Sequence, residues 1–428
     1  MAAINIPFGS PLAAKVFGAA VFAGVQAEPG FMNLLSGGAP DQSAAESKMK
    51  GQTSADYPIV KVTDLSKSAG DNVTVDLFNI FTGKPVMGDQ RIAGRGMTTT
   101  SSTQDVSINR SRGMADSGGK MAQKRTRHNL RSIVRAGLTN WAGRLEDQRA
   151  LVALAGARGD QTTADWIVPV GASSATADPD FSTIMVNTVQ APTKNRQYYA
   201  GTASSAATIG TTNLLGLGDI DRIGSALRES IVPLQPIKIK GDLYAWNEPL
   251  YVMFVTQRQW AYLKRPSQTQ YLTSLQNAVK RFDGQRHPLF MGDSIMWSGI
   301  LVKPLGRYAV RFNAGTNVVY DTGGADGGTY TEANSTVAGG ITVDRAIICG
   351  AQALLKVYGN EETSDYFYSW NEELVDHKSA VEVSLSMMEG VGKTRFRINN
   401  VDTDHGVAVL DSYAPDLNSA AGQTAMAS

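Results

Sequence analysis

The sequence predicts an α+β protein that is completed by neighbouring molecules. An extended segment rich in glycine, serine and threonine covers residues 56–119, and one long amphipathic helix is predicted over residues 120–158. Alternating and continuous apolar runs in the second half of the chain predict further strands and helices. Because the extended segment is too polar to form its own core, this pairing indicates assembly rather than chemistry.

Length and composition limit the number of domains and the classes of partner that the protein is expected to have. The 428 residues exceed the usual ~100–200 residues of one compact domain, so two or three lobes are expected. Forty basic against 39 acidic residues argue against general affinity for nucleic acid or membranes, and no stretch approaches the ~20 apolar residues of a membrane span. The single cysteine, Cys349, lies in an apolar run, which predicts a buried, inert thiol in a reducing compartment.

Residues 1–55 are predicted to form an N-terminal arm that contains a short amphipathic helix. The alternative is a signal peptide, because Lys15 precedes an apolar run over residues 16–25 and Ala27 ends a small-residue cleavage pattern. The run is only ten residues long and its charge follows two prolines, which favours the arm.

The extended segment and the helix are predicted from their periodicity. Strands are expected at 57–62 and 72–78, followed by a turn-rich stretch at 83–94 and a polar run at 98–117 whose order depends on contacts outside the chain. In the helix, apolar side chains recur at steps of three and four, at Leu130, Val134, Leu138, Trp141, Leu145, Val152 and Ala155.

The second half predicts a mixed set of elements. Helices are expected at 219–230, after the cap Thr256, at 267–282 and at 346–357. Strands are expected at 250–255, 300–303 and 308–312, and a loop at 315–340. Residues 380–386 and 393–398 alternate cleanly and are predicted to pair as antiparallel strands.

Charge is distributed unevenly along the chain. The segment from Arg91 to Arg135 contains ten basic residues and only two acidic residues, Asp105 and Asp116. Residues 360–376 contain six acidic residues and no basic residue. Blocks of opposite charge on one chain either attract each other between subunits and promote self-association, or form two separate solvent-exposed surfaces. The candidate contacts between subunits are Arg91, Arg95, Arg110, Arg112, Lys120, Glu361, Glu362, Asp365, Glu372 and Glu373.

The sequence shows no catalytic constellation. Residues 390–394 resemble a phosphate-binding loop, but Met387 occupies the position of its first glycine, so a hairpin turn is the better interpretation. The histidines are dispersed along the sequence. His377 and His405 each follow an aspartate, but adjacent residues on a strand point to opposite faces, so neither aspartate is expected to orient its histidine as a catalytic base. No catalytic residue, metal ligand or cofactor is therefore predicted, and the protein is not expected to be an enzyme.

Two other functions stay open from the residues alone. A secreted β-rich hydrolase would use the signal-like N-terminus with His377 or His405. A non-specific nucleic-acid binder would use the basic residues between 120 and 135, although this run lacks aromatic side chains for base stacking.

Several stretches also carry a family resemblance. Residues 70–77 and 88–94 are similar to the start of an extended loop, and 287–302 contain a Pro-Leu-Phe-Met-Gly block followed by a strand pattern. Residues 345–353 end in Gly-Ala-Gln-Ala, and 370–377 with 392–396 are similar to closing strands. In this order, over about residues 57–398, the chain resembles the N4-like family of tailed-phage major capsid proteins, which share the HK97 capsid fold. It has Asp376-His-Lys where that family often has Tyr-Gly.

The resemblance implies an HK97-like arrangement. Its parts would be the N-terminal arm at 1–55, an extended β-hairpin loop (E-loop) at 56–119, a peripheral domain at 120–235 with a spine helix at 120–158, an axial domain at 236–375, and a return to peripheral strands with a C-terminal tail at 376–428.

The resemblance also implies a function and partners. Hexamers and pentamers would tile an icosahedral shell around double-stranded DNA, which is contacted non-specifically, and E-loops would lie across neighbouring subunits. An arm of 55 residues looks short for a fused scaffolding domain, so a separate scaffolding protein is expected, with a portal protein and a decoration protein. The expected location is the virion after assembly in the host bacterial cytoplasm, with no membrane partner.

Overall fold

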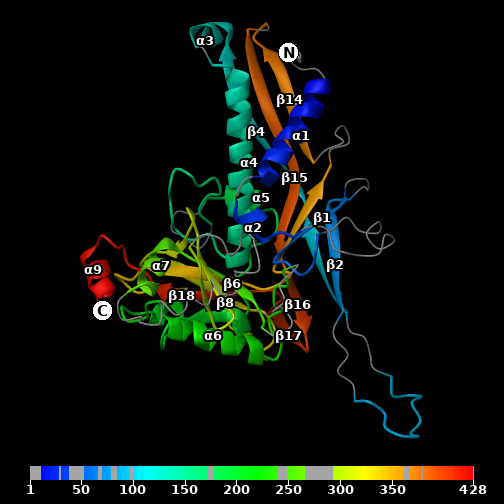
Figure 1. The fold of residues 1–428 in the computed structure, drawn as a ribbon, viewed down its shortest axis with the longest axis vertical. Coiled ribbons are helices and arrows are strands. Elements are labelled where there is room, and N and C mark those ends of the chain that lie inside the picture. The colour runs from blue at the N-terminus through cyan, green and yellow to red at the C-terminus, as the bar shows by residue number, and fades with distance from the viewer. Residues whose placement is uncertain are drawn as a thin grey trace.

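Two β-sheets and one long helix organise the molecule, which is elongated along the helix (Figure 1). The computed structural model describes residues 11–27, 30–37, 53–65, 70–78, 84–96, 101–126, 128–171, 178–239, 248–265, 293–360, 367–377 and 379–427. The predicted helix at 267–282 lies outside these residues, as does the start of the 287–302 block.

The first sheet has five strands built around β15. They are β1 (Ile59–Leu65), β4 (Asn109–Gly119), β13 (Leu354–Gly359), β14 (Tyr368–Val375) and β15 (Ala380–Lys393). The order is β1-β13-β15-β14, and β4 pairs with the other edge of β15. Val383, Leu385 and Met387 alternate along β15 and are fully buried, because successive strand side chains point to opposite faces.

Helix α4 (Leu130–Ala155) covers the buried face of this sheet. Leu138 and Leu145 are buried in the main core, and Trp141 lies against Gly113 of β4. Asn129 caps the first turn, since its side chain accepts a hydrogen bond from the Ser132 amide. The expected single helix over 120–158 is therefore wrong at its start: α3 (Lys120–Arg125) is a separate helix beyond this cap (Figure 1).

The N-terminal segment packs against the same face. Helix α1 (Pro11–Ala27) confirms the predicted helix, and α2 (Phe31–Leu35) follows it. Phe17 stacks on Trp370 with ring centroids 5.8 Å apart, and Phe22 packs edge-on against Tyr368. Aromatic side chains of α1 therefore form part of the core that covers this sheet.

The second sheet has seven strands. They are β5 (Gln197–Tyr199), β6 (Tyr251–Val255), β7 (Ile295–Trp297), β8 (Ile300–Pro304), β9 (Val310–Phe312), β12 (Val343–Cys349) and β18 (Val407–Tyr413). The order is β5-β18-β12-β6-β8-β7, and β9 also pairs with β12. Helices α6 (Leu217–Glu229) and α7 (Gln257–Leu263) confirm predictions, including the Thr256 cap, whose side chain accepts from the Gln259 amide.

Two predictions in this half are wrong. The expected helix at 346–357 forms β12 and β13 instead, because a continuous apolar run does not distinguish a buried strand from a buried helix. The expected antiparallel pair at 380–386 and 393–398 is also wrong, since β15 continues to Lys393 without a hairpin turn. Residues after it form β16 (Arg395–Ile398), which pairs with β17 (Val401–Asp404).

A hairpin projects from the first sheet. Strands β2 (Asn72–Phe78) and β3 (Ser101–Ser107) pair antiparallel, and residues 84–96 lie far from the sheets (Figure 1). The hairpin is shorter than the expected 56–119, because β1 and β4 belong to the five-stranded sheet. A small cluster fixes the hairpin to that sheet, made of Val60, Val62, Val106, Leu355 and Val357.

The remaining elements are short. The predicted loop at 315–340 contains β10 (Asn317–Asp321) paired with β11 (Glu332–Thr336). The others are α5 (Asp180–Met185), the 3-10 helices η1 (Lys194–Arg196) and η2 (Ala206–Thr208), and α9 (Ala420–Ala427). Among the described residues, no helix has the length and apolar character needed to cross a bilayer.

The expected domain boundaries do not follow the division between the sheets. Strands β13 and β14 lie within the expected axial range 236–375 but pair with β15, and β18 returns from the C-terminal range to the seven-stranded sheet. The chain therefore passes between the sheets more than once. The assignment of residues to an axial and a peripheral domain stays a prediction.

Candidate functional site

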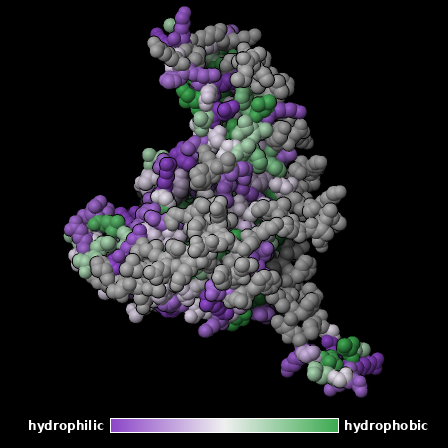
Figure 2. Space-filling view, viewed as in Figure 1, coloured by the Kyte–Doolittle hydropathy of each residue, from purple (hydrophilic) through white to green (hydrophobic). Residues whose placement is uncertain are grey.

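The tip of the hairpin, residues 84–96, combines exposed apolar and exposed basic side chains. Met87 is 70% exposed and Ile92 is 73% exposed. Lys84, Arg91 and Arg95 are also exposed, and Arg95 donates a hydrogen bond to the Gln90 side chain at 2.7 Å. Figure 2 shows hydrophobic and hydrophilic side chains together on this projecting tip. The tip is therefore suited to a partner outside its own subunit.

The other predicted contact residues have different surroundings. Arg110 and Arg112 are exposed on β4, where Arg110 donates to the Ser386 hydroxyl at 2.8 Å. Lys120 begins α3. Glu361, Glu362 and Asp365 lie outside the described residues.

Glu372 and Glu373 point to opposite faces of β14. Glu372 is buried and accepts two hydrogen bonds from Arg131 of α4, both at 2.7 Å. The Arg131 guanidinium also lies over the Phe17 ring, 4.5 Å from its centroid. Glu372 thus fastens α4 to the sheet within one subunit, whereas Glu373 is exposed and stays a predicted intersubunit contact.

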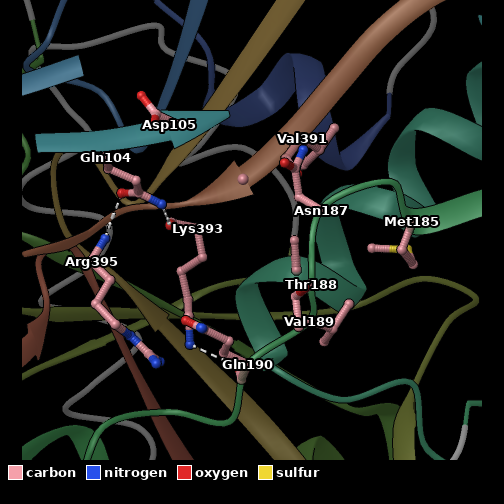
Figure 3. Close-up of a pocket in the computed structure, with 12 residues that line it drawn as sticks. Gln104, Asp105, Met185, Asn187, Thr188, Val189, Gln190, Val391, Lys393 and Arg395 are labelled. Carbon is pink, nitrogen blue, oxygen red and sulfur yellow. Dashed lines mark hydrogen bonds between the residues drawn. The ribbon is translucent and has the colours of Figure 1, made fainter. Parts of the chain in front are cut away.

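Two carboxamides hold the base of the hairpin (Figure 3). The Gln104 side chain donates to the Lys393 carbonyl at 2.6 Å and accepts from the Arg395 amide at 2.8 Å. Asn187 accepts from the Ser107 amide at 2.9 Å and donates to the Ser107 carbonyl. These side chains border a polar cavity of about 340 Å³. Sequence reasoning missed both, because a single amide side chain in a loop or strand carries no distinctive pattern.

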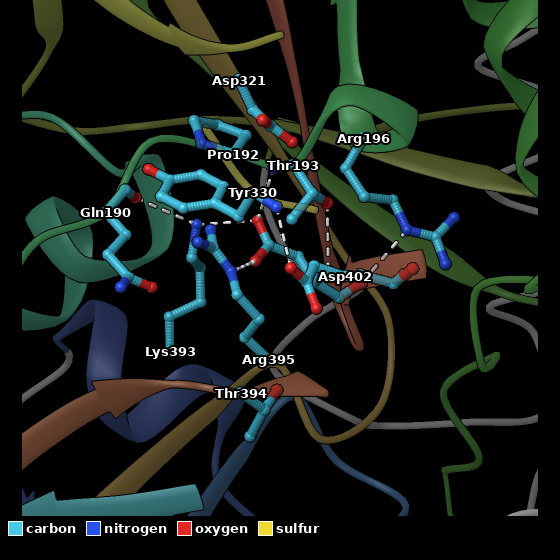
Figure 4. Close-up of polar contacts among 12 residues, drawn as sticks. Gln190, Pro192, Thr193, Arg196, Asp321, Tyr330, Lys393, Thr394, Arg395 and Asp402 are labelled. Atoms are coloured by element: carbon cyan, nitrogen blue, oxygen red, sulfur yellow. Dashed lines mark hydrogen bonds and ion pairs between the residues drawn. The ribbon is translucent and has the colours of Figure 1, made fainter. Parts of the chain in front are cut away.

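An ionic junction around Asp404 lies next to the base of the hairpin, and Figure 4 shows Lys393, Arg395 and Thr193, which take part in it. Lys393 and Arg395 each donate to the buried Asp404 carboxylate at 2.7 Å. Burial alone would raise the pKa of Asp404, but Lys393 and Arg395 together have the larger effect, so the pKa of Asp404 lies below its usual value. Burial lowers the pKa of Lys393 to about 8. Thr193 donates its amide to the same carboxylate at 3.2 Å, so the junction ties β15, β16 and β17 to the segment before η1.

The same junction bears on the hydrolase alternative. The Asp404 carboxylate faces Lys393 and Arg395, and the Nδ1 atom of His405 has no hydrogen-bond partner within the described residues. Burial, with a contribution from Arg196, lowers the pKa of His405 to about 4. His377 lies in an exposed turn with φ of 50°. The structure therefore does not join Asp404 and His405 into a base and its orienting carboxylate.

A second buried network joins α4 to the five-stranded sheet. Glu389 contacts Lys356 and Arg149, each at 2.5 Å. Glu146 accepts a hydrogen bond from the Tyr368 hydroxyl and lies 3.4 Å from Lys356. Burial raises the pKa of Glu146 to about 7, although Lys356 acts in the opposite direction. Burial also disfavours ionised Glu389, but Lys356 and Arg149 outweigh it and lower the pKa of Glu389 to about 2.

Comparison with known proteins identifies the family. A family model described as phage capsid protein matches residues 5–416. The chain belongs to the phage capsid protein family. As a capsid protein it is a structural component of a phage virion, and the capsid resemblance predicted from the sequence is confirmed.

Individual relatives agree with this assignment. The capsid protein is 23% identical to the major capsid protein of Pseudomonas phage KPP25 over 348 residues, which cover 80% of this chain and 83% of the relative. The capsid of Ralstonia phage GP4 is 25% identical with a TM-score of 0.69, covering 98% of this chain and 100% of the other. The cyanophage Pam1 capsid shares the fold, with 20% identity, a TM-score of 0.55, and coverage of 84% and 89%.

Proposed function

We propose that this capsid protein assembles as hexamers and pentamers into an icosahedral, HK97-like head around double-stranded DNA. The observation that supports this is the hairpin tip, where Met87 and Ile92 are 70% and 73% exposed on a loop far from the subunit's own sheets. Exposed apolar groups gathered on a projecting loop mark an interaction surface. In the assembled shell the hairpin would lie across a neighbouring subunit and cover these side chains.

The proposed partners are those of a head-forming protein. A separate scaffolding protein would guide assembly in the host bacterial cytoplasm, a portal protein would occupy one vertex, and a decoration protein would bind outside. Packaged DNA would contact the shell without sequence preference, through electrostatic attraction between basic side chains and phosphates.

The assembly proposal is tested by imaging particles from cells that express the protein with the scaffolding protein. Wild-type protein is expected to give closed shells in electron micrographs, whereas the double substitution M87D/I92D is expected to give soluble subunits or capsomers. The control M87L/I92V keeps both side chains apolar and is expected to assemble. Closed shells from M87D/I92D at the wild-type yield would rule out the hairpin tip as an assembly contact.

A further inference from the structure

The outer face of the five-stranded sheet carries three carboxylates in one cross-strand row. Glu373 of β14 lies opposite Glu382 of β15, and Glu382 lies opposite Asp116 of β4. Residues in register share a face, and this face is opposite to the one that Trp141 of α4 covers through Gly113. Glu373 and Asp116 are exposed, and Glu382 is half-buried.

This row is unfavourable within one subunit. Directly opposed side chains in a sheet have Cβ atoms about 4.5–5.5 Å apart, and like charges in that position destabilise the pair. Asp116 accepts a hydrogen bond from the Gly118 amide at 2.7 Å, which is a neutral donor. Within the described part of the chain, none of the three carboxylates has an ion-pair partner. A positive partner from outside the subunit would therefore be favourable here.

An apolar side chain lies next to the row on the same face. Met114 is 67% exposed, two positions before Asp116 along β4. Further along the sheet the subunit's own hairpin covers this face, since Val106 lies against Gly392 and Ser107 lies against Gly390. The row and Met114 are therefore an exposed continuation of a surface that already accepts a hairpin.

The hairpin tip has the complementary chemistry. Its basic side chains are Lys84, Arg91 and Arg95 against the single carboxylate Asp89, and Met87 and Ile92 supply exposed apolar surface. We propose that the face formed by Glu373, Glu382, Asp116 and Met114 is the docking surface for the hairpin tip of a second copy of this chain. Arg91 and Arg95 would pair with the carboxylates, and Ile92 would pack on Met114. This inference rests on the proposed shell function and names the surface that receives the tip.

A charge exchange tests the pairing. The variants E373K/E382K and R91E/R95E are each expected to abolish shell formation, and the four substitutions together are expected to restore it, because the opposite charges again face each other. Wild-type protein assayed in parallel separates the two proposals. If wild type forms no shells, the proposed function fails; if shells form from each double variant alone, only the docking surface fails.

A measurement on the unassembled subunit checks folding separately. E382Q removes the central charge of the row while keeping the shape of the side chain, so its melting temperature is expected to rise above that of wild type. S384A, one pair along the same face of β15, is the matched control and is expected to melt like wild type. A fall in melting temperature for E382Q would overturn the claim that the row is unfavourable in the free subunit.

Cross-linking identifies the contact directly. Cys349 is the only cysteine in the sequence and is buried, so new cysteines report without interference. Subunits with M114C and subunits with I92C, mixed and co-assembled, are expected to form mixed disulfide dimers in shells and none as free subunits. Shells without mixed dimers would overturn the proposal, as would shells that contain only M114C–M114C dimers, which indicate two copies packed face to face.

Discussion

At the scale of single residues, Glu146 makes stability depend on pH. Its folded-state pKa is raised from an ordinary 4.5 to about 7, so the folded protein keeps a proton there that the unfolded chain has released. The stability contributed by this group is therefore lost as pH rises from about 4.5 to about 7. The difference corresponds to about 3 kcal/mol at most.

E146Q tests this. Glutamine can still accept from the Tyr368 hydroxyl but carries no charge, so E146Q is expected to match wild type near pH 5 and to exceed its unfolding free energy near pH 8. Urea denaturation of free subunits at both pH values measures the difference. E229Q, which removes an exposed carboxylate in α6, is the control. Equal curves for wild type and E146Q at pH 8 would show that Glu146 is ionised there without cost.

Glu389 has the opposite dependence. Its folded-state pKa is lowered to about 2, so the stability that it contributes is present above about 4.5 and is lost as pH falls towards 2. E389Q leaves the buried cations Lys356 and Arg149 without this counter-charge, which is expected to cost about 3–5 kcal/mol of unfolding free energy at neutral pH. E373Q, exposed on the same sheet, is expected to show no such loss. Denaturation curves of E389Q that overlap wild type would contradict this.

At the scale of elements, α4 needs its apolar face. Leu145 is 3% exposed and lies in the main core, so L145D places an unpaired charge there and is expected to prevent folding, at a cost of several kcal/mol. L138D is expected to act in the same way. N140D, an exposed position of the same helix, is the control. Soluble, cooperatively melting L145D protein would show that this face of α4 contributes little.

Helix α1 is expected to stabilise the folded subunit. Phe22 packs against Tyr358, Phe367 and Tyr368, so F22A is expected to lower the unfolding free energy by about 3 kcal/mol. V16A, at an exposed position of α1, is the control. For the same reason, a chain that lacks α1 and α2 is expected to melt at a lower temperature than the full chain when both are measured as free subunits.

Sequence patterns predicted the elements whose burial is one-sided or strongly capped. Residues 72–78 alternate, and Thr256 begins α7 as expected, because both signals are local. The strands at 343–359 were missed since they are buried on both faces and have no periodicity. The turn-rich stretch at 83–94 was predicted from composition, but the polar run at 98–117 was wrongly expected to depend on contacts outside the chain, because its described part pairs within the subunit as β3 and β4. The row of Glu373, Glu382 and Asp116 was not predicted, because it depends on the register of three strands, one of them more than 250 residues away in the sequence.

At the scale of the whole molecule, the proposed docking combines charge with apolar burial. Raising salt from ~0.1 M to ~1 M shortens the screening length from ~10 Å to ~3 Å and so weakens the attraction between the basic tip and the carboxylates. The rate of shell assembly, measured by light scattering, is therefore expected to fall. Shells already formed are expected to persist, because Met87 and Ile92 stay buried. E373Q/E382Q is expected to show less dependence on salt than wild type. If the wild-type assembly rate did not change with salt concentration, apolar contact rather than charge would be the main contribution to docking.

One of the links between the two sheets has a consequence for shell curvature. Residues 350–353 join β12 to β13, and all four backbone amides donate, to the carbonyls of Gly406, Gln235, Tyr57 and Pro58. A link braced on both sides resists bending, so the sheets would turn as one rigid body. Five-fold and six-fold rings require different tilts between subunits. We therefore expect subunits from the two kinds of ring to keep the same angle between their sheets and to differ in the direction of the hairpin.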